Sequence, residues 1–234
     1  IQTIEKVIDA DCLGIGIGVP GLVDAKKGIV YDLTFIPSWK EVHLKETLEN
    51  YFKLPVFVNN DSNCFALGEK FFGKGVHCSN FVAVTLGTGL GSGIIIENML
   101  YSGTYTGAGE FGCISYKNST IEDHCASGFF TRMGTNGEDL YLAAKNGDPK
   151  ALAAFSTYGN NLSEAVKIIL YTCDPEMIIL GGSISNAWEF FIDSLWKGLE
   201  DYMFPVVLKT LKIEKSTLKD SAILGAVGLV YNYS

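Results

Sequence analysis

A glycine-rich stretch in the middle of the chain has the composition of an anion-binding turn. Residues 82–96 read VAVTLGTGLGSGIII, in which four glycines at alternate positions separate two apolar, β-branched runs. This pattern predicts a strand, a glycine turn and a second strand. Glycine has no Cβ and tolerates positive φ, so backbone N–H groups in such a turn can converge on a phosphate oxygen. A tight hairpin without a ligand gives the same pattern, because short glycine motifs are common.

Two carboxylates occupy positions from which they could act on a bound molecule. Glu110 lies in a second glycine-rich loop, GAGEFG at 107–112, and Asp61 follows the apolar run Pro55–Val58 within the segment NNDSN. In an open α/β sheet, ligands bind at the carboxyl ends of the strands, where Asp61 is expected. Alternatively, Asp61 or Ser62 caps the helix that follows, and Glu110 is a solvated acid in a turn.

The elements that position these residues follow the order of an α/β protein. Apolar runs bounded by glycine predict buried strands, and apolar residues at helical spacing predict the helices between them. The pattern predicts two α/β lobes. Strands are expected at 13–19, 55–58, 82–86, 94–96 and 177–180, and helices at 40–52, 64–72, 149–171, 187–203 and 222–233, while 113–137 is expected to be irregular.

Composition excludes several classes of partner and site. The formal net charge of −8 argues against nucleic acid or an anionic membrane as the main partner, so backbone amides and a metal ion would have to hold a phosphorylated ligand. No apolar run is long enough to cross a membrane, and the N-terminus lacks the features of a signal peptide. Six scattered cysteines without pair spacing indicate free thiols in a reducing cytoplasm and no structural zinc site.

Five short motifs follow one another along the chain: GVPGLVD at 18–24, NDSNCFALGE at 60–69, LGTGLG at 86–91, AGEFG at 108–112 and LGG at 180–182. In this order they resemble the motifs of the ROK family, which comprises repressors, uncharacterised proteins and sugar kinases of the actin-like ATPase (ribonuclease H-like) superfamily. The resemblance implies a two-lobed α/β fold that binds ATP and sugar between the lobes. The N-terminal lobe would comprise residues 1–61 and 218–234, and the C-terminal lobe residues 62–217.

The same resemblance assigns roles to individual residues. Asp61 matches the catalytic base, which takes the proton of the sugar hydroxyl as that hydroxyl attacks the γ-phosphate of ATP. This role suits phosphoryl transfer, which depends on alignment, charge neutralisation by Mg²⁺ and a proton acceptor. The resemblance further implies sugar contacts from Asn60, Glu110, Gly21 and Thr34, a phosphate loop at Gly87, Thr88 and Gly89, and an adenosine loop at Gly181 and Gly182.

The sequence departs from the family pattern around the sugar. Cys113 stands where the family usually has a histidine that contacts zinc and sugar, and Ser115–Thr120 replaces the zinc-binding cysteine cluster. We therefore expect no structural zinc. A second sugar-binding glutamate usually follows the cluster. It is Glu122 if the register is set by Phe129 and Phe130, which we prefer, or Asp123 if the register is set by Ser127 and Gly128.

The Asp-x-Gly-Gly-Thr loop that contacts the ATP phosphates in the family does not occur in the 234 residues. They are therefore expected to belong to a longer protein or a truncated relative, and to be inactive on their own. The expected function is that of a cytoplasmic, dimeric, ATP-dependent kinase of a hexose or N-acetylhexosamine, similar to glucokinase. The alternatives are a sugar-sensing repressor, which would bind DNA through an upstream helix-turn-helix, and a non-catalytic assembly protein. Asp61 and the 87–89 loop favour a kinase, because a sensor that binds only sugar needs no nucleotide loop.

Overall fold

The chain forms two compact units in a computed structural model that describes residues 1–33 and 36–233. The first unit comprises Ile1–His77, Gly93–Ala108 and Leu218–Ser234, and the second comprises Cys78–Ser92 and Gly109–Thr217. This division differs from the lobes expected from the sequence, because residues 62–77 and 93–108 pack with the first unit.

The first unit contains two small sheets. In the first sheet, β1 and β5 pair in parallel along their whole length, from Ile15 opposite Val56 to Val19 opposite Asn60. In the second, β2, β3 and β4 form an antiparallel sheet. Buried valines and leucines of both sheets and of α1 make one core. The elements of this unit are a 3₁₀ turn (Ile4–Lys6), β1 (Ile15–Val19), β2 (Leu22–Asp24), β3 (Ile29–Tyr31), β4 (Glu41–His43), α1 (Leu44–Phe52), β5 (Val56–Asn60), α2 (Asp61–Phe72), β8 (Met99–Tyr101) and α9 (Ser221–Tyr233).

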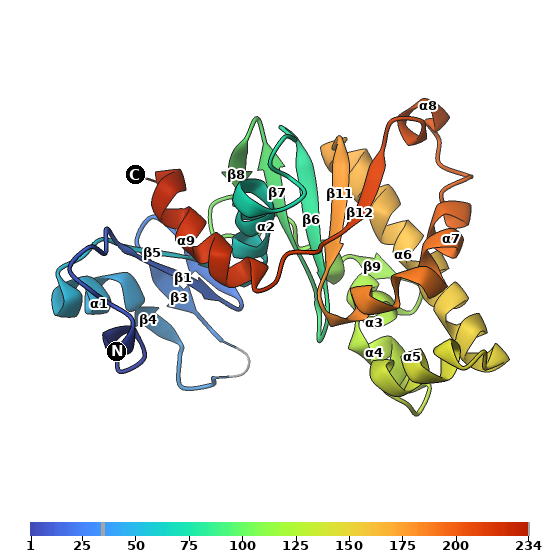
Figure 1. Cartoon of the computed structure of the whole chain (residues 1–234), viewed down its shortest axis with the longest axis horizontal. Helices are drawn as coiled ribbons and strands as arrows, with labels where there is room; N and C mark the ends of the chain where they lie inside the picture. The colour runs from blue at the N-terminus through green and yellow to red at the C-terminus, as the bar shows by residue number, and fades with distance from the viewer. Residues whose placement is uncertain (34–35, 234) are drawn as a thin grey trace. The chain divides into compact units, whose positions relative to one another are not determined.

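Helices α2 and α9 lie side by side in the first unit (Figure 1). Their backbones touch because glycines face the partner helix. A Cβ atom added to Gly68 would overlap the carbonyl oxygen of Ser221, and one added to Gly225 would overlap the carbonyl oxygen of Cys64. This close packing holds the first turn of α2, where Asp61 lies.

A sheet with a fully buried central strand forms the second unit. β11 pairs in parallel with β12 on one side and β6 on the other, and all five residues of β11 are buried. β7 begins in this unit after the glycine turn and continues into the first unit, where it pairs antiparallel with β8. These strands are β6 (Phe81–Leu86), β7 (Leu90–Ile96), β11 (Met177–Gly181) and β12 (Lys212–Lys215).

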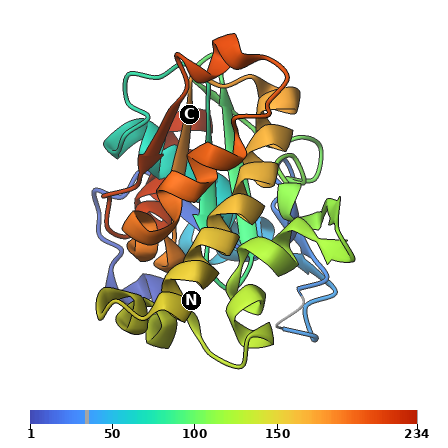
Figure 2. The same ribbon diagram turned by 90° about the vertical axis from the view of Figure 1, so that its right-hand side faces the viewer.

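Long helices cover this sheet, and aromatic residues fill the space beneath them. Helix α6 crosses in front of the strands in Figure 2, with α7 packed beside it. Tyr158 of α6 is fully buried, stacks on Phe130 and donates a hydrogen bond from its hydroxyl to the carbonyl oxygen of Cys125 at 2.8 Å. The remaining elements are 3₁₀ turns at Phe111–Cys113 and Ser183–Ala187, β9 (Ser115–Tyr116), β10 (Ser119–Thr120), α3 (Ile121–Cys125), α4 (Ser127–Arg132), α5 (Gly137–Lys145), α6 (Pro149–Cys173), α7 (Trp188–Gly198) and α8 (Pro205–Leu208).

Two expectations of secondary structure were wrong. The helix expected at 40–52 begins only at Leu44, because Glu41–His43 form β4. Residues 113–137 were expected to be irregular, but they contain the hairpin of β9 and β10 and the helices α3 and α4. All six cysteines are free thiols. Within the described part of the chain, no helix combines the length and the apolar character that crossing a bilayer requires.

Candidate active site

Asp61 is the first residue of α2 and follows β5 directly. Asn60 caps this helix: its Oδ1 accepts hydrogen bonds from the backbone N–H groups of Ser62 at 2.8 Å and Asn63 at 3.3 Å. The Asp61 carboxylate also accepts a bond from the Ser62 N–H, at 2.9 Å, yet Asp61 is solvent-exposed. The alternative in which Asp61 or Ser62 caps the helix is therefore wrong, because Asn60 is the cap, and the Asp61 carboxylate is accessible to a ligand.

The surroundings of Asp61 favour its neutral form. Neighbouring protein atoms exclude part of the solvent and raise the pKa of Asp61 above its ordinary value, while the backbone N–H of Ser62 acts in the opposite direction. Desolvation is the larger effect. A carboxylate with a raised pKa is a stronger proton acceptor than an ordinary aspartate, which suits a general base.

Three of the predicted residues meet in the first unit. Asn60 Nδ2 donates a hydrogen bond to the carbonyl oxygen of Gly21 at 3.2 Å, which joins the turn after β1 to the start of α2 beside Asp61. Thr34, the fourth residue predicted on this side, lies outside the described residues. The other predicted residues all belong to the second unit.

Glu110 and Cys113 lie together at the 3₁₀ turn after the second glycine-rich loop. Both residues are exposed, and Cys113 Sγ donates a hydrogen bond to Glu110 Oε2 at 3.7 Å. Desolvation, followed by the negative charge of Glu110, raises the pKa of the Cys113 thiol. The thiol therefore stays protonated at neutral pH and acts as a hydrogen-bond donor to Glu110.

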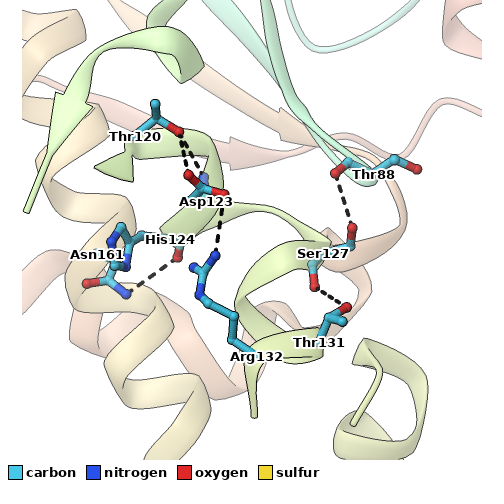
Figure 3. A network of polar contacts seen from close by, with 8 residues as sticks. All are labelled: Thr88, Thr120, Asp123, His124, Ser127, Thr131, Arg132 and Asn161. Carbon is cyan, nitrogen blue, oxygen red and sulfur yellow. Dashed lines mark hydrogen bonds and ion pairs between the residues drawn. The ribbon is translucent and has the colours of Figure 1, made fainter. Parts of the chain in front are cut away.

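Glu122 and Asp123, the alternatives for the second sugar carboxylate, have different partners. Asp123 accepts a hydrogen bond from Thr120 Oγ1 at 3.1 Å and pairs with Arg132 at 3.3 Å (Figure 3). The bond from Thr120 is the main cause that lowers the pKa of Asp123. Glu122 instead accepts the backbone N–H of Leu90 on Oε2 at 2.9 Å. Asp123 thus fixes α3 and α4, and Glu122 reaches the glycine hairpin.

Ser127, at the start of α4, hydrogen-bonds to the glycine hairpin, which is the turn at residues 87–89 between β6 and β7. Ser127 donates its backbone N–H to Gly87 O at 2.9 Å and its hydroxyl to Thr88 O at 3.1 Å (Figure 3). Across the described chain, the N–H groups of Thr88 and Gly89 have no acceptor, and no heavy atom lies within 4 Å of a Cβ built on Gly87. The hairpin therefore offers free backbone donors beside open space, as phosphate loops do.

A second glycine turn follows β11 and packs against the end of β6. Gly182 has φ 83°, and a Cβ there would overlap the carbonyl oxygen of Leu86. Both the positive φ and the close approach of Leu86 require glycine at this position. The residues after the turn line a pocket of about 630 Å³ together with the hairpin residues Gly87 and Thr88. Of the predicted nucleotide-binding residues, Gly87 and Thr88 thus line this cavity in the second unit. Gly89, Gly181 and Gly182 are adjacent in sequence to lining residues but do not line it themselves.

The lining of this pocket suits a nucleoside. Phe130, Tyr141 and Ile184 supply apolar and aromatic surface for a flat base, and the polar groups include Asn136 and Glu138 at the start of α5. Small-molecule sites typically span ~300–1,000 Å³ and combine apolar walls with a few polar groups. The cavity therefore has the size and the mixed lining of a small-molecule site.

No group of three or more His, Cys, Asp or Glu side chains gathers as metal ligands among residues 1–33 and 36–233. Mg²⁺ needs no such cage, because it is commonly held by substrate phosphates with one or two carboxylates. At the position of the family's zinc cluster, Asn161 accepts hydrogen bonds from Lys117 Nζ at 2.7 Å and from the Tyr116 hydroxyl at 3.3 Å.

Sequence reasoning missed the residues that complete the pocket and the hairpin. Ser127, Asn136 and Tyr141 come from helices α4 and α5, in or beside the segment expected to be irregular. The Asn-Gly-Glu-Asp run at 136–139 did carry a helix-start signal, since asparagine is a favoured N-cap and acidic residues favour the first turn. Asn136 does cap α5, accepting the Asp139 N–H at 2.9 Å.

Comparisons with known proteins agree with this architecture. The model of the ROK family matches residues 1–232. A glucokinase of Thermotoga maritima is 30% identical over 98% of this chain and 83% of its own length. A xylose repressor of Caldicellulosiruptor bescii is 32% identical over 93% of this chain, which spans only 62% of that protein.

A solved structure of a ROK family protein is also similar to this chain. The ROK family glucokinase of Streptomyces griseus, in complex with glucose and AMPPNP, matches 94% of this chain and 81% of its own with a TM-score of 0.80 and 27% identity. The fold is that of actin-like ATPases. Kinases and repressors are therefore both among the proteins similar to this chain, which belongs to the ROK family.

Proposed function

We propose that the full-length protein is an ATP-dependent kinase of a hexose or N-acetylhexosamine. The observation that carries this proposal is the pocket of about 630 Å³ bordered by the glycine hairpin and the turn after β11. A protein that only senses sugar has no need for a nucleoside-sized cavity with free phosphate-binding N–H groups at its edge. Glucokinases and a β-glucoside kinase among the relatives support the same choice.

Asp61 is the proposed general base. Its carboxylate is exposed, and its raised pKa favours proton transfer from a sugar hydroxyl as the new bond to phosphorus forms. The sugar is proposed to contact Gly21, Thr34, Asn60, Glu110, Cys113 and Glu122. Carboxylates are acceptor-only groups, so Glu110 and Glu122 suit a polyol that offers several hydroxyl donors.

The nucleotide is proposed to lie in the second unit. The N–H groups of Thr88 and Gly89 would bind phosphate oxygens, and the turn at Gly181 and Gly182 would face the adenosine. Ser183 and Ile184, which follow that turn, line the pocket. When bound with ATP, Mg²⁺ neutralises the phosphate charge that develops during transfer. No structural zinc is proposed, because residues 115–120 carry no cysteine where the family has its zinc-binding cluster.

The runner-up function is a sugar-sensing repressor, supported by the similarity to xylose repressors. In that case DNA binding would reside outside the residues described here. We place either protein in the cytoplasm as a homodimer, following the free thiols and the family resemblance.

The experiment that tests this function measures ADP formation by the full-length protein with ATP and Mg²⁺ across a panel of hexoses and N-acetylhexosamines. We expect turnover with one or a few sugars. If none is phosphorylated but one raises the melting temperature, the protein is a sensor and the kinase proposal fails.

A further inference from the structure

The glycine hairpin is tied to the segments that carry both proposed sugar carboxylates. Ser92 Oγ donates a hydrogen bond to the carbonyl oxygen of Gly109, next to Glu110, at 2.5 Å. Glu122 Oε2 accepts the Leu90 N–H at 2.9 Å. All of these residues belong to the second unit. Hydrogen bonds therefore join the strand after the proposed phosphate loop to the Glu122 carboxylate and to the backbone next to Glu110.

Glu122 is placed to contact both ligands at once. It is exposed, and its Oε2 lies 2.5 Å from where a Cβ on Gly89 would be, so the missing side chain of Gly89 makes room for the carboxylate. In the described part of the chain, Oε1 of Glu122 accepts no hydrogen bond. A carboxylate can accept about four hydrogen bonds, so one oxygen can hold Leu90 while the other accepts a sugar hydroxyl.

We propose that Glu122 couples sugar binding to nucleotide binding. The inference rests on the proposed kinase function and concerns how its two subsites communicate. A sugar hydroxyl on Oε1 fixes the rotamer of Glu122, which then holds the Leu90 N–H and the adjoining Gly89 in place. The nucleotide then binds a hairpin that is already ordered, so the hairpin loses less conformational freedom when the nucleotide binds. By linkage, the nucleotide raises the sugar affinity by the same factor.

The test measures the dissociation constant of AMPPNP–Mg²⁺ by calorimetry on the full-length protein, with and without a saturating sugar. The probe is glucose, replaced by the hexose or N-acetylhexosamine with the largest thermal shift if glucose gives none. We expect the sugar to tighten AMPPNP binding at least ~5-fold, the lower end of typical coupling. In Glu122→Ala the ratio should fall below ~2-fold, and Glu122→Gln, which retains an acceptor for Leu90, should give an intermediate ratio.

Two further variants separate coupling from a general loss of structure. Ser127→Ala removes the hydroxyl bond to Thr88 on the far side of the hairpin, so it should weaken AMPPNP binding equally with and without sugar and leave the ratio unchanged. Gly89→Ala places a methyl group against the Glu122 carboxylate and should weaken sugar binding, although Gly89 belongs to the nucleotide hairpin.

The outcomes distinguish this inference from the function on which it rests. If AMPPNP and sugar both bind but the ratio in the wild-type protein stays below ~2-fold, or Glu122→Ala and Glu122→Gln both keep the wild-type ratio, the coupling is refuted and the kinase stands. If Glu122→Ala no longer binds sugar, the ratio of Glu122→Gln is used instead: a ratio below that of the wild-type protein supports the coupling, and a wild-type ratio refutes it. If AMPPNP or every sugar of the panel fails to bind the wild-type protein, the kinase proposal fails with it.

Discussion

Replacing Gly225 with alanine should disturb the helix that carries Asp61. Gly225 lies in α9 and faces the first turn of α2, and a Cβ built there lies 1.6 Å from the carbonyl oxygen of Cys64. Ordinary contact begins at 3.4 Å. The obstacle is backbone rather than a flexible side chain, so α2 and α9 must part by roughly 2 Å or the new methyl group must be expelled by a local distortion.

The free-energy change follows from two opposing effects. Alanine is intrinsically better than glycine in a helix by about 1 kcal/mol. Overpacking a well-packed core costs typically ~1–3 kcal/mol and occasionally more, and an overlap with rigid backbone belongs at the upper end. We therefore expect Gly225→Ala to lower the free energy of unfolding by about 2 kcal/mol. A displacement of about 1 Å at the base can lower kcat by up to about 100-fold, so sugar phosphorylation should fall as well.

Urea unfolding of the wild-type protein, Gly225→Ala and Gly137→Ala measures the change. Gly137 is the first residue of α5, and a Cβ there meets Phe130 at an ordinary 3.5 Å, so this control should keep the wild-type stability within about 0.5 kcal/mol. A Gly225→Ala variant as stable as the control would refute the close packing of α2 on α9.

Three other predictions follow from the site. Because Asp61 must be ionised to act as a base and its pKa is raised, kcat/KM should fall on the acid side at a higher pH than an ordinary aspartate would give; a profile of kcat/KM against pH with the ordinary value of 3.8 contradicts this. Because folding raises the pKa of Asp61, ionisation of this carboxyl destabilises the folded protein as the pH rises from 3.8 through the raised pKa, and the loss persists at higher pH. Asp61→Asn, which cannot ionise, should therefore melt higher than the wild-type protein at pH 7 but not below pH 3.8, as calorimetry at the two pH values can show. Asn161→Leu leaves Lys117 without its amide acceptor and should lower the free energy of unfolding by about 2 kcal/mol, whereas EDTA should leave the melting temperature unchanged; a fall with EDTA would indicate a structural metal.

Regular, locally determined elements were predictable from the sequence. The helix expected at 149–171 is α6, which begins at Pro149 because Asp148 caps it and proline suits the first helical position. The buried strand expected at 177–180 is β11, whose continuous apolar run fits a central parallel strand. In each case the local pattern and the tertiary environment favour the same structure.

Elements stabilised by distant contacts were not predictable. Helices α3 and α4 are short, and their stability comes from packing, such as the Tyr158 hydroxyl on Cys125 O and the stacking of Phe130 on Tyr158. The strand β4 at Glu41–His43 was expected to be helical, but it pairs with the preceding strand β3, and this pairing overrides the helical spacing of its residues.

The candidate site was predictable in residue type rather than in detail. Asn60, Asp61 and Ser62 can all cap a helix, so the sequence could not say which residue does so and which carboxylate stays accessible. Glu122 and Asp123 are adjacent, and only the three-dimensional positions of Leu90 and Arg132 distinguish their partners. The roles of these residues in binding and catalysis remain predictions.

The most direct test of the central claim is the turnover number of full-length Asp61→Asn on the sugar that the wild-type protein phosphorylates. Loss of a general base should lower kcat by about 100-fold or more while sugar still binds. Asp193→Asn, a matched change at an exposed residue of α7, should retain wild-type kcat. An Asp61→Asn variant with kcat close to that of Asp193→Asn would contradict the assignment of Asp61 as the base.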